Sequence, residues 1–262
     1  KEGGKGTRGG LVELDYSTKK LTGLKHFGES PEGRVPHDEL TMGTNGLLYG
    51  ITLQAGDGAG VIFSIDPKTD AFKVEQKLSK EGGTAAVTKL IEADPNNFYF
   101  CTSGGGLNGR GTVKKWDATT KEEKAIGHFT YLNAYSATSD LTMGIDENLY
   151  GVCNSGGDNN RGVLYKIDTK QDTLLQVASF NNNGPIQPQT KLVALSNGNF
   201  LSTSYNGGDH NKGTIFEYDA TLDSIVVLVH LTDSIGRGGN SGFTKANNGK
   251  YYTYFGYTTN PT

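Results

Sequence analysis

Apolar residues along this chain come in short runs separated by turn residues, and no long stretch follows the spacing of an amphipathic helix. The segment "GTIFEYDATLDSIVVLVHL" holds two such runs on either side of an Asp-x-Thr turn, which predicts a hairpin. The segment before it, "KLVALSNGNFLSTSYNGG", predicts a second hairpin with an Asn-Gly turn. The pattern therefore predicts an all-β chain.

The two-hairpin pattern recurs every 51 residues, and three sets of positions keep that step. The glycines are Gly9, Gly60, Gly111, Gly162 and Gly213. The aspartates are Asp15, Asp66, Asp117, Asp168 and Asp219. The large apolar residues are Phe27, Leu78, Phe129, Phe180 and Leu231. A period near 50 is typical of solenoids, propellers and similar arrays, so we expect five repeats of about 51 residues.

Four antiparallel strands per repeat leave sheet edges that closure into a ring would protect. We therefore predict a five-bladed β-propeller in a single domain over residues 1–262. In the first complete repeat we expect "ELTMGT" to be the innermost strand, then "LLYGITL", then "GVIFSID", with "FKVEQKL" outermost. The chain begins with the second half of a repeat and finishes with the first half, so we expect the two ends to share one blade. A linear β-solenoid is the alternative, although its repeats are usually shorter.

Composition narrows the functional classes. The 262 residues include 38 Gly and 13 Tyr, and no apolar run approaches the length of a membrane-spanning helix. The formal charge of -3 and the pI near 6.0 argue against nucleic acid as a partner, because such binders usually carry a basic excess. Cys101 and Cys153 lie one register position apart in consecutive repeats, which disfavours a disulfide, and no CxxC or HExxH motif indicates a metal site.

The glycine-rich loops carry the candidate chemistry. We expect their Gly-Gly pairs to adopt the positive φ of tight turns. Polar residues follow each pair, and a basic residue precedes the repeated glycine in four of the five repeats. Arginine beside Asp or Asn suits sugar hydroxyls or carboxylates, and tyrosine supplies a stacking face. The predicted ligand-binding residues are Arg8, Asp57, Asn108, Arg110, Asp158, Asn159, Arg161, Tyr205, Asp209, His210, Lys212 and Tyr257.

Other interpretations stay open at this point. The basic residues could instead pair with neighbouring aspartates in solvated loops, and loops of this kind could chelate calcium, although they lack the EF-hand spacing. Otherwise we expect no cofactor. The repeated aspartates are expected to cap turns. A glycosidase pair could come from Asp38, Glu39 and Asp140. A protein docking platform would use Tyr131 and Tyr135.

The repeats resemble the GloVer-type tandem repeat, whose units read like "LYG-T--GG----G-VF--D". This chain has "LYGITLQAGDGAGVIFSID" and "LYGVCNSGGDNNRGVLYKID", with departures in "FYFCTSGGGLNGRGTVKKWD" and "NFLSTSYNGGDHNKGTIFEYD". The resemblance covers nearly the whole chain and implies a propeller-like architecture in secreted or surface-attached proteins, with no catalytic residues. Repeated loops on one face suit multivalent binding. We therefore expect a non-enzymatic, lectin-like protein that is secreted or lies at the cell surface.

Overall fold

The computed structural model of the chain describes residues 8–28, 31–55, 59–79, 83–130, 135–137, 139–239 and 241–256. It divides into two compact units, Lys1–Ala125 and Ile126–Thr262, with the division inside strand β11. Every sheet is antiparallel, and the described residues form no helix, so none that could cross a membrane. The all-β prediction is confirmed.

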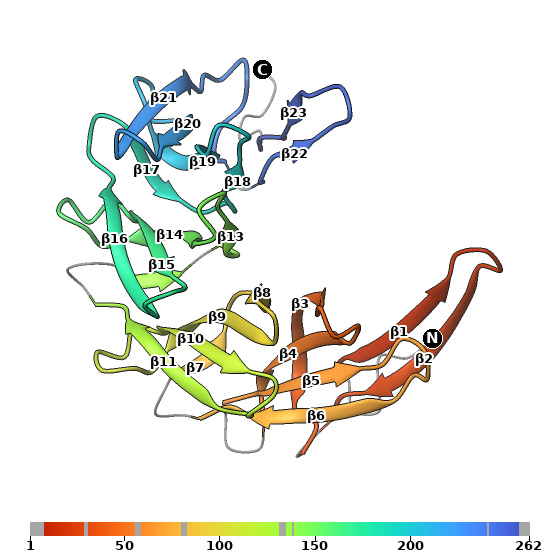
Figure 1. Cartoon of the computed structure of the whole chain (residues 1–262). Helices are drawn as coiled ribbons and strands as arrows, with labels where there is room; N and C mark the ends of the chain where they lie inside the picture. Colours follow the sequence, from red (N-terminus) through yellow and green to blue (C-terminus); the bar gives the residue numbers. More distant parts are fainter. Residues whose placement is uncertain are drawn as a thin grey trace. The chain divides into compact units, whose positions relative to one another are not determined.

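Unit 1 contains three sheets (Figure 1). A two-stranded hairpin comprises β1 (Gly10–Asp15) and β2 (Lys20–His26). A four-stranded sheet comprises β3 (Arg34–Met42), β4 (Leu48–Gln54), β5 (Val61–Ile65) and β6 (Phe72–Lys77). A five-stranded sheet comprises β7 (Thr84–Ala86), β8 (Ile91–Asp94), β9 (Asn97–Gly104), β10 (Thr112–Asp117) and β11 (Glu123–His128).

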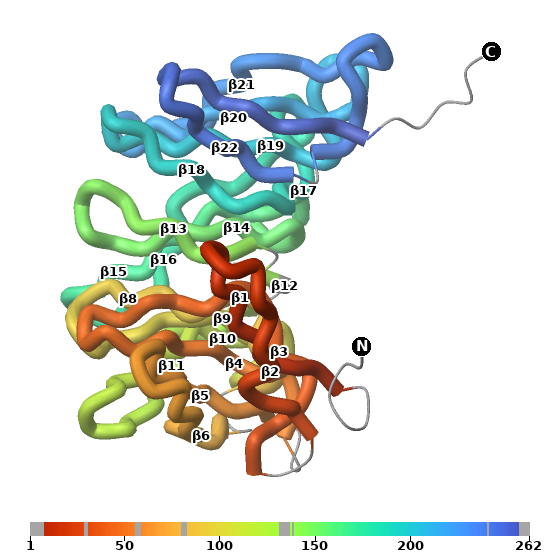
Figure 2. The backbone as a smooth tube through the Cα atoms, turned by 90° about the vertical axis from the view of Figure 1, so that its right-hand side faces the viewer, coloured from red at the N-terminus to blue at the C-terminus, as the bar shows by residue number. Residues whose placement is uncertain are grey.

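Unit 2 also contains three sheets. The first comprises β12 (Tyr135–Ala137), β13 (Thr142–Met143), β14 (Leu149–Ser155), β15 (Val163–Asp168) and β16 (Thr173–Ser179). The second comprises β17 (Pro185–Pro188), β18 (Val193–Ala194), β19 (Phe200–Gly207), β20 (Thr214–Asp219) and β21 (Ser224–His230). The third is the hairpin of β22 (Thr244–Lys245) and β23 (Tyr251–Tyr252). Figure 2 shows the first two sheets as successive layers.

Within each full sheet the strands follow the predicted order, as in β3-β4-β5-β6. The structure differs in the innermost strand, which is split in three of the four full sheets. Buried threonines explain the break in two of these sheets. The amide of Cys101 donates to Oγ1 of Thr88 at 2.9 Å, and that of Thr203 donates to Oγ1 of Thr190 at 3.4 Å. A hydroxyl thus replaces the backbone acceptor of the inner strand, and the strand resumes at β8 and β18.

The repeated glycines are required by their backbone conformation. All five have φ between 88° and 112°. At Gly60 and Gly111 an added Cβ would lie 2.0 Å from a carbonyl oxygen of the preceding strand. The repeated Phe or Leu is bound to this turn, because the amides of Phe27, Leu78, Phe180 and Leu231 donate to the repeated glycine of the same repeat. The repeated glycines therefore form the turn, and the repeated Phe or Leu is buried in the core.

The repeated aspartates cap the turns at the opposite ends of the strands. In every repeat the Asp carboxylate accepts the amide two residues on, as in Asp117 with Thr119 at 2.7 Å and Asp219 with Thr221 at 2.9 Å. The position that closes the same turn has positive φ in all five repeats; its residues are Lys19, Asp70, Lys121, Asp172 and Asp223. The predicted turn role of the aspartates is confirmed.

The cores lie between successive sheets. In unit 1 the rings of Tyr49, Phe98 and Trp116 pack together, with centroids 4.6 to 5.7 Å apart. In unit 2 the rings of Tyr150, Phe200 and Tyr218 repeat this arrangement at centroid distances of 4.3 to 6.5 Å. These two clusters lie two repeats apart in sequence, so corresponding parts of the two units can be compared directly.

Candidate functional site

The three Gly-Gly loops that the structure describes, which join the second strand of a sheet to the third, share one backbone conformation. In two of them an asparagine closes the loop: Oδ1 of Asn160 accepts the amide of Gly156, and Oδ1 of Asn211 accepts that of Gly207, both at 3.0 Å. Both asparagines have positive φ. In the loop between β9 and β10, Gly109 takes this position, with φ of 65°. A backbone hydrogen bond also closes each of the three loops. Sequence reasoning did not single out the two asparagines.

The basic residues of these loops contact the segment that leads to the next sheet. The carbonyl oxygens of Arg8, Arg161 and Lys212 accept the amides of Val35, Gln187 and Gly238. All three donor residues have positive φ. Among the side chains, Nε of Arg161 donates to Asn182 at 2.7 Å, and Nζ of Lys212 pairs with Asp233 at 2.7 Å. The alternative interpretation expected pairing with a neighbouring aspartate of the same loop, whereas the partner of Lys212 is Asp233 in the following segment.

The polar residues at the loop tips point outward. Asn108, Asp158, Asn159, Asp209 and His210 are all exposed. The amide of Asp209 binds Nδ1 of His230 at 3.0 Å, which fixes the loop backbone beneath its side chain.

The other predicted ligand-binding residues have different surroundings. Tyr205 is 40% exposed, and its ring lies close to Gly238. Arg8 and Arg110 are half-buried. Asp57 and Tyr257 lie outside the described residues. Arg8, Asn108 and Arg110 belong to unit 1, whereas Asp158, Asn159, Arg161, Tyr205, Asp209, His210 and Lys212 belong to unit 2.

The glycosidase and docking interpretations involve residues of both units. Asp38 and Glu39 lie in β3 of unit 1, where Glu39 pairs with Lys89 at 2.5 Å, and Asp140 lies in unit 2. Tyr131 and the side chain of Tyr135 lie outside the described residues. Among the side chains that the structure describes, no three His, Cys, Asp or Glu residues converge as a metal site would require. Cys101 and Cys153 are both buried.

Unit 2 contains a polar pocket that the sequence analysis did not predict. It has a volume of about 560 Å³ and lies between the sheets β12–β16 and β17–β21, at the strand ends opposite the Gly-Gly loops. Its lining residues are Ile145, Asp146, Tyr150, Lys166, Leu175, Gln176, Val177, Asn197, Gly198, Tyr218, Ala220, Thr221 and Asp223. We call it the unit 2 pocket. A volume of this size suits a small organic ligand.

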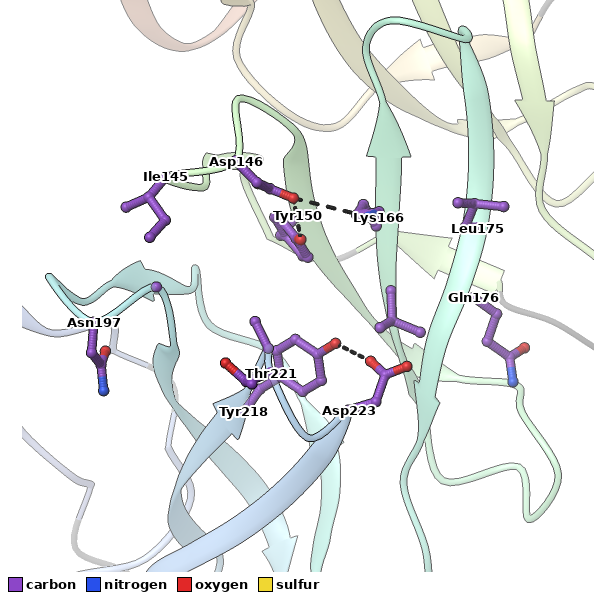
Figure 3. A pocket seen from close by; sticks show the side chains of 13 residues that line it. Ile145, Asp146, Tyr150, Lys166, Leu175, Gln176, Asn197, Tyr218, Thr221 and Asp223 are labelled. Carbon is purple, nitrogen blue, oxygen red and sulfur yellow. Dashed lines mark hydrogen bonds and ion pairs between the residues drawn. The ribbon is translucent and has the colours of Figure 1, made fainter.

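One wall of the unit 2 pocket carries Asp146 and Tyr150 (Figure 3). Oδ2 of Asp146 accepts the Tyr150 hydroxyl at 2.8 Å and the Asn148 side-chain amide at 2.7 Å, while Nζ of Lys166 lies 3.9 Å away. Burial raises the pKa of Asp146, but the hydrogen bonds from Asn148 and Tyr150 lower it below its usual value. Asp146 is therefore a carboxylate at neutral pH.

The other wall carries Tyr218 and Asp223. The Tyr218 hydroxyl donates to Oδ1 of Asp223, and Figure 3 shows this pair across the pocket from Asp146. Burial and the hydrogen bond to Asp223 raise the pKa of Tyr218, and burial likewise raises that of Tyr150. Both phenols therefore stay neutral donors, and each is directed at a carboxylate.

The unit 2 pocket has a detectable sequence signal. Asp223 occupies the turn position at which the repeat two earlier carries Lys121, and Lys166 replaces Ser64 in the same way. Changes of charge between otherwise matched repeats could have identified these residues. The pattern shared by all repeats hides them, because its recurrent aspartate, Asp219 in this turn, is a structural cap.

Comparison with known families identifies the repeats. The model of the Gloeobacter/Verrucomicrobia repeat matches residues 1–144 and again residues 57–260. The chain belongs to this family. The resemblance drawn from the sequence is thereby confirmed. No curated protein matches the chain.

Solved structures resemble the chain at low identity. The extracellular domain of a one-component system from B. thetaiotaomicron has a TM-score of 0.58 at 10% identity, covering 92% of this chain and 28% of that one. TolB from Acinetobacter baumannii has a TM-score of 0.49 at 14% identity, covering 89% of this chain and 55% of that one. A protein assigned as TolB from Agrobacterium tumefaciens has a TM-score of 0.49 at 11% identity, covering 84% of this chain and 72% of that one. The likeness at 0.58 concerns the fold alone.

Proposed function

We propose that this chain is a five-bladed β-propeller that binds carbohydrate without catalysis, outside the cell or at its surface. Membership of a tandem-repeat family and the likeness to an extracellular domain support this proposal. The observation that carries it is the shared conformation of the Gly-Gly loops, which present exposed Asp, Asn and His side chains from fixed turns. Rigid loops with polar tips suit hydroxyl recognition, and their repetition suits polymeric glycans.

The five-bladed ring needs the two terminal hairpins to form one blade, whereas in the structure β1–β2 and β22–β23 are separate two-stranded sheets. The exposure of apolar residues in β1 supports the proposal. Val12 and Leu14 are 55% and 57% exposed, but their counterparts in the other four repeats are at most 2% exposed. β1 thus presents a face that a neighbouring sheet would bury and an edge with which a further strand would pair. The segment after the Asn248-Gly249 turn has the matching place in its repeat.

A glycan array probed with the labelled chain, with and without a calcium chelator, tests the carbohydrate proposal. We expect signals from one class of sugar. The chelator arm tests calcium directly, because a calcium-bridged sugar would be lost on chelation. A blank array would overturn the carbohydrate proposal.

The loops can be tested with a set of variants. Replacing Asp158, Asn159, Asp209 and His210 with Ala, all at exposed tips, should abolish the array signal and leave thermal stability unchanged. The matched control replaces Lys20, Lys68 and Lys170, which are exposed at the opposite strand ends, and should retain the signal. Equal signals from both sets of variants would exclude the loops as the binding site.

Protein docking on the same loops is the second candidate. The observation favouring it is Leu107, which is 81% exposed at the tip of the loop between β9 and β10. An exposed leucine on a rigid turn can act as an apolar anchor for a protein. Leu107→Ser should leave a glycan signal unchanged but weaken capture of a protein partner from the native surface.

A further inference from the structure

The unit 2 pocket has a counterpart in unit 1, and that counterpart is occupied by the protein itself. In unit 1 Nζ of Lys121 pairs with Oε2 of Glu75 at 2.7 Å and lies 5.2 Å from the centroid of the Trp116 ring. Glu75 also accepts hydrogen bonds from Ser64 at 2.6 Å and Lys73 at 2.9 Å. An ammonium group therefore fills this position in unit 1, held by a carboxylate and an aromatic ring.

The same backbone position in unit 2 carries the opposite charge. Lys121 and Asp223 close equivalent turns of their repeats, with φ of 64° and 54°. Their surroundings are matched as well, because Tyr150, Phe200 and Tyr218 replace Tyr49, Phe98 and Trp116 in similar packing. The difference is that unit 2 has an aspartate and an open pocket where unit 1 has its own ammonium.

The remaining substitutions change the charged groups that line the pocket. Val177 takes the place of Glu75, so the outer strand contributes no carboxylate, and Asp146 takes the place of Asn45 on the opposite wall. The ionised groups lining the unit 2 pocket are two carboxylates, Asp146 and Asp223, and the single ammonium of Lys166. The pocket thus carries one excess negative charge. A cationic ligand would be attracted by that charge.

The other lining residues suit a sugar. Gln176 and Asn197 offer amide groups for hydroxyls, and Ile145 and Leu175 are 68% and 44% exposed beside them. Apolar side chains of this kind pack against the C–H face of a pyranose ring, while the polar groups set its orientation.

We propose that the unit 2 pocket binds a sugar bearing a free primary ammonium group, with Asp223 as the carboxylate that receives it and Asp146 on the opposite wall. This inference rests on the proposed carbohydrate function and names a ligand class and a second location for it. The ligand ammonium takes the role that Lys121 has in unit 1.

Isothermal titration of the whole chain with a β-1,4-linked glucosamine tetramer tests the inference. The N-acetylated tetramer is the matched probe, because it has the same sugar ring without the positive charge. We expect the glucosamine tetramer to bind at least tenfold more tightly. Equal affinity for the two tetramers, or no binding of the glucosamine tetramer, would overturn the inference.

Three variants locate the site. Asp223→Asn keeps the acceptor for Tyr218 and removes the charge, and it should weaken glucosamine binding at least tenfold. Asp70→Asn is the control, since Asp70 is an exposed aspartate at the same turn position with φ of 58°. The double change Val177→Glu with Asp223→Lys rebuilds the unit 1 arrangement and should abolish binding in a chain that still melts cooperatively. Wild-type affinity in Asp223→Asn would overturn the assignment.

The array described above separates the two proposals. If neutral or acidic glycans bind and the glucosamine tetramer does not, the ammonium inference is wrong and the carbohydrate function stands. If neither the array nor the tetramer gives binding, both are wrong.

Discussion

Lys114 and Glu123 form an ion pair inside unit 1, at positions where the other repeats carry apolar side chains. Nζ of Lys114 contacts Oε1 of Glu123 and donates to the carbonyl of Ser79 at 3.0 Å. The exposed fractions of the two side chains are 0% and 6%. The corresponding pairs elsewhere are Phe63 with Phe72, Tyr165 with Leu174, and Phe216 with Ile225.

We predict that Lys114→Met lowers the free energy of unfolding by about 3–5 kcal/mol, because it leaves a buried carboxylate without its cation. The double variant Lys114→Phe with Glu123→Leu, which copies the other repeats, should be at least as stable as the wild type. Urea denaturation measures both. A double variant as unstable as the single one would show that this interior cannot accept the apolar pair.

Glu75 should make unit 1 sensitive to acid. Burial raises the pKa of Glu75, but the hydrogen bonds from Lys121, Ser64 and Lys73 lower it by more. The pKa of Glu75 therefore lies below 4.5 in the folded state. A depressed pKa stabilises the fold fully above the unfolded value and loses that contribution as the pH falls through the folded value. Glu75→Gln should therefore be less stable than the wild type at pH 7, with the difference shrinking below about pH 4.5. Melting temperatures at both pH values test this, and a constant difference would contradict it.

Gly111 should be intolerant of any side chain. Its φ of 95° and the 2.0 Å approach of an added Cβ to the Thr102 carbonyl combine strain with a clash. Gly111→Ala should lower the free energy of unfolding by about 2 kcal/mol or more, compared with about 1 for Gly109→Ala. Gly109 is the matched control because its φ is 65° and its Cβ would meet no atom within 4 Å. Equal losses in the two variants would remove the clash from the explanation.

The proposed ring can be tested by a crosslink. Ser202 pairs with Phe216, and Gly50 with Phe63; the corresponding residues at the chain ends are Thr253 and Val12. In the chain with Val12→Cys and Thr253→Cys we expect a disulfide within one chain, seen as a faster band on non-reducing gels. A disulfide-linked dimer, or no disulfide at all, would contradict closure within the chain.

The repeating framework could be predicted from sequence because it depends on local chemistry. An aspartate that accepts the amide two residues on, or a glycine that must have positive φ, is specified within a few residues, and each recurs five times. The strand order within a sheet follows from the same turns. The prediction that the two ends share one blade is of another kind, because it depends on pairing between segments far apart in the sequence, and in the structure these segments form two separate hairpins.

The unit 2 pocket was harder to predict for a physical reason. Asp146 and Asp223 come from turns of different sheets, and their proximity depends on how those sheets pack. The strained conformations of Val35 and Gln187 are equally hidden, since neither residue type favours positive φ. Tertiary hydrogen bonds to the carbonyls of Arg8 and Arg161 accompany these conformations.

The bond between the repeated Phe or Leu and the repeated glycine has a consequence for synthesis of the chain. The amide of Phe180 donates to the carbonyl of Gly162, and that of Leu231 to the carbonyl of Gly213. Each of these hydrogen bonds therefore joins residues separated by the same short stretch of sequence. Each full sheet likewise uses strands from a single stretch of about one repeat. Contacts this local form quickly and need no distant segment. As the chain leaves the ribosome, each sheet can therefore assemble before the next one has been translated, which limits the time that its apolar strands spend unpaired.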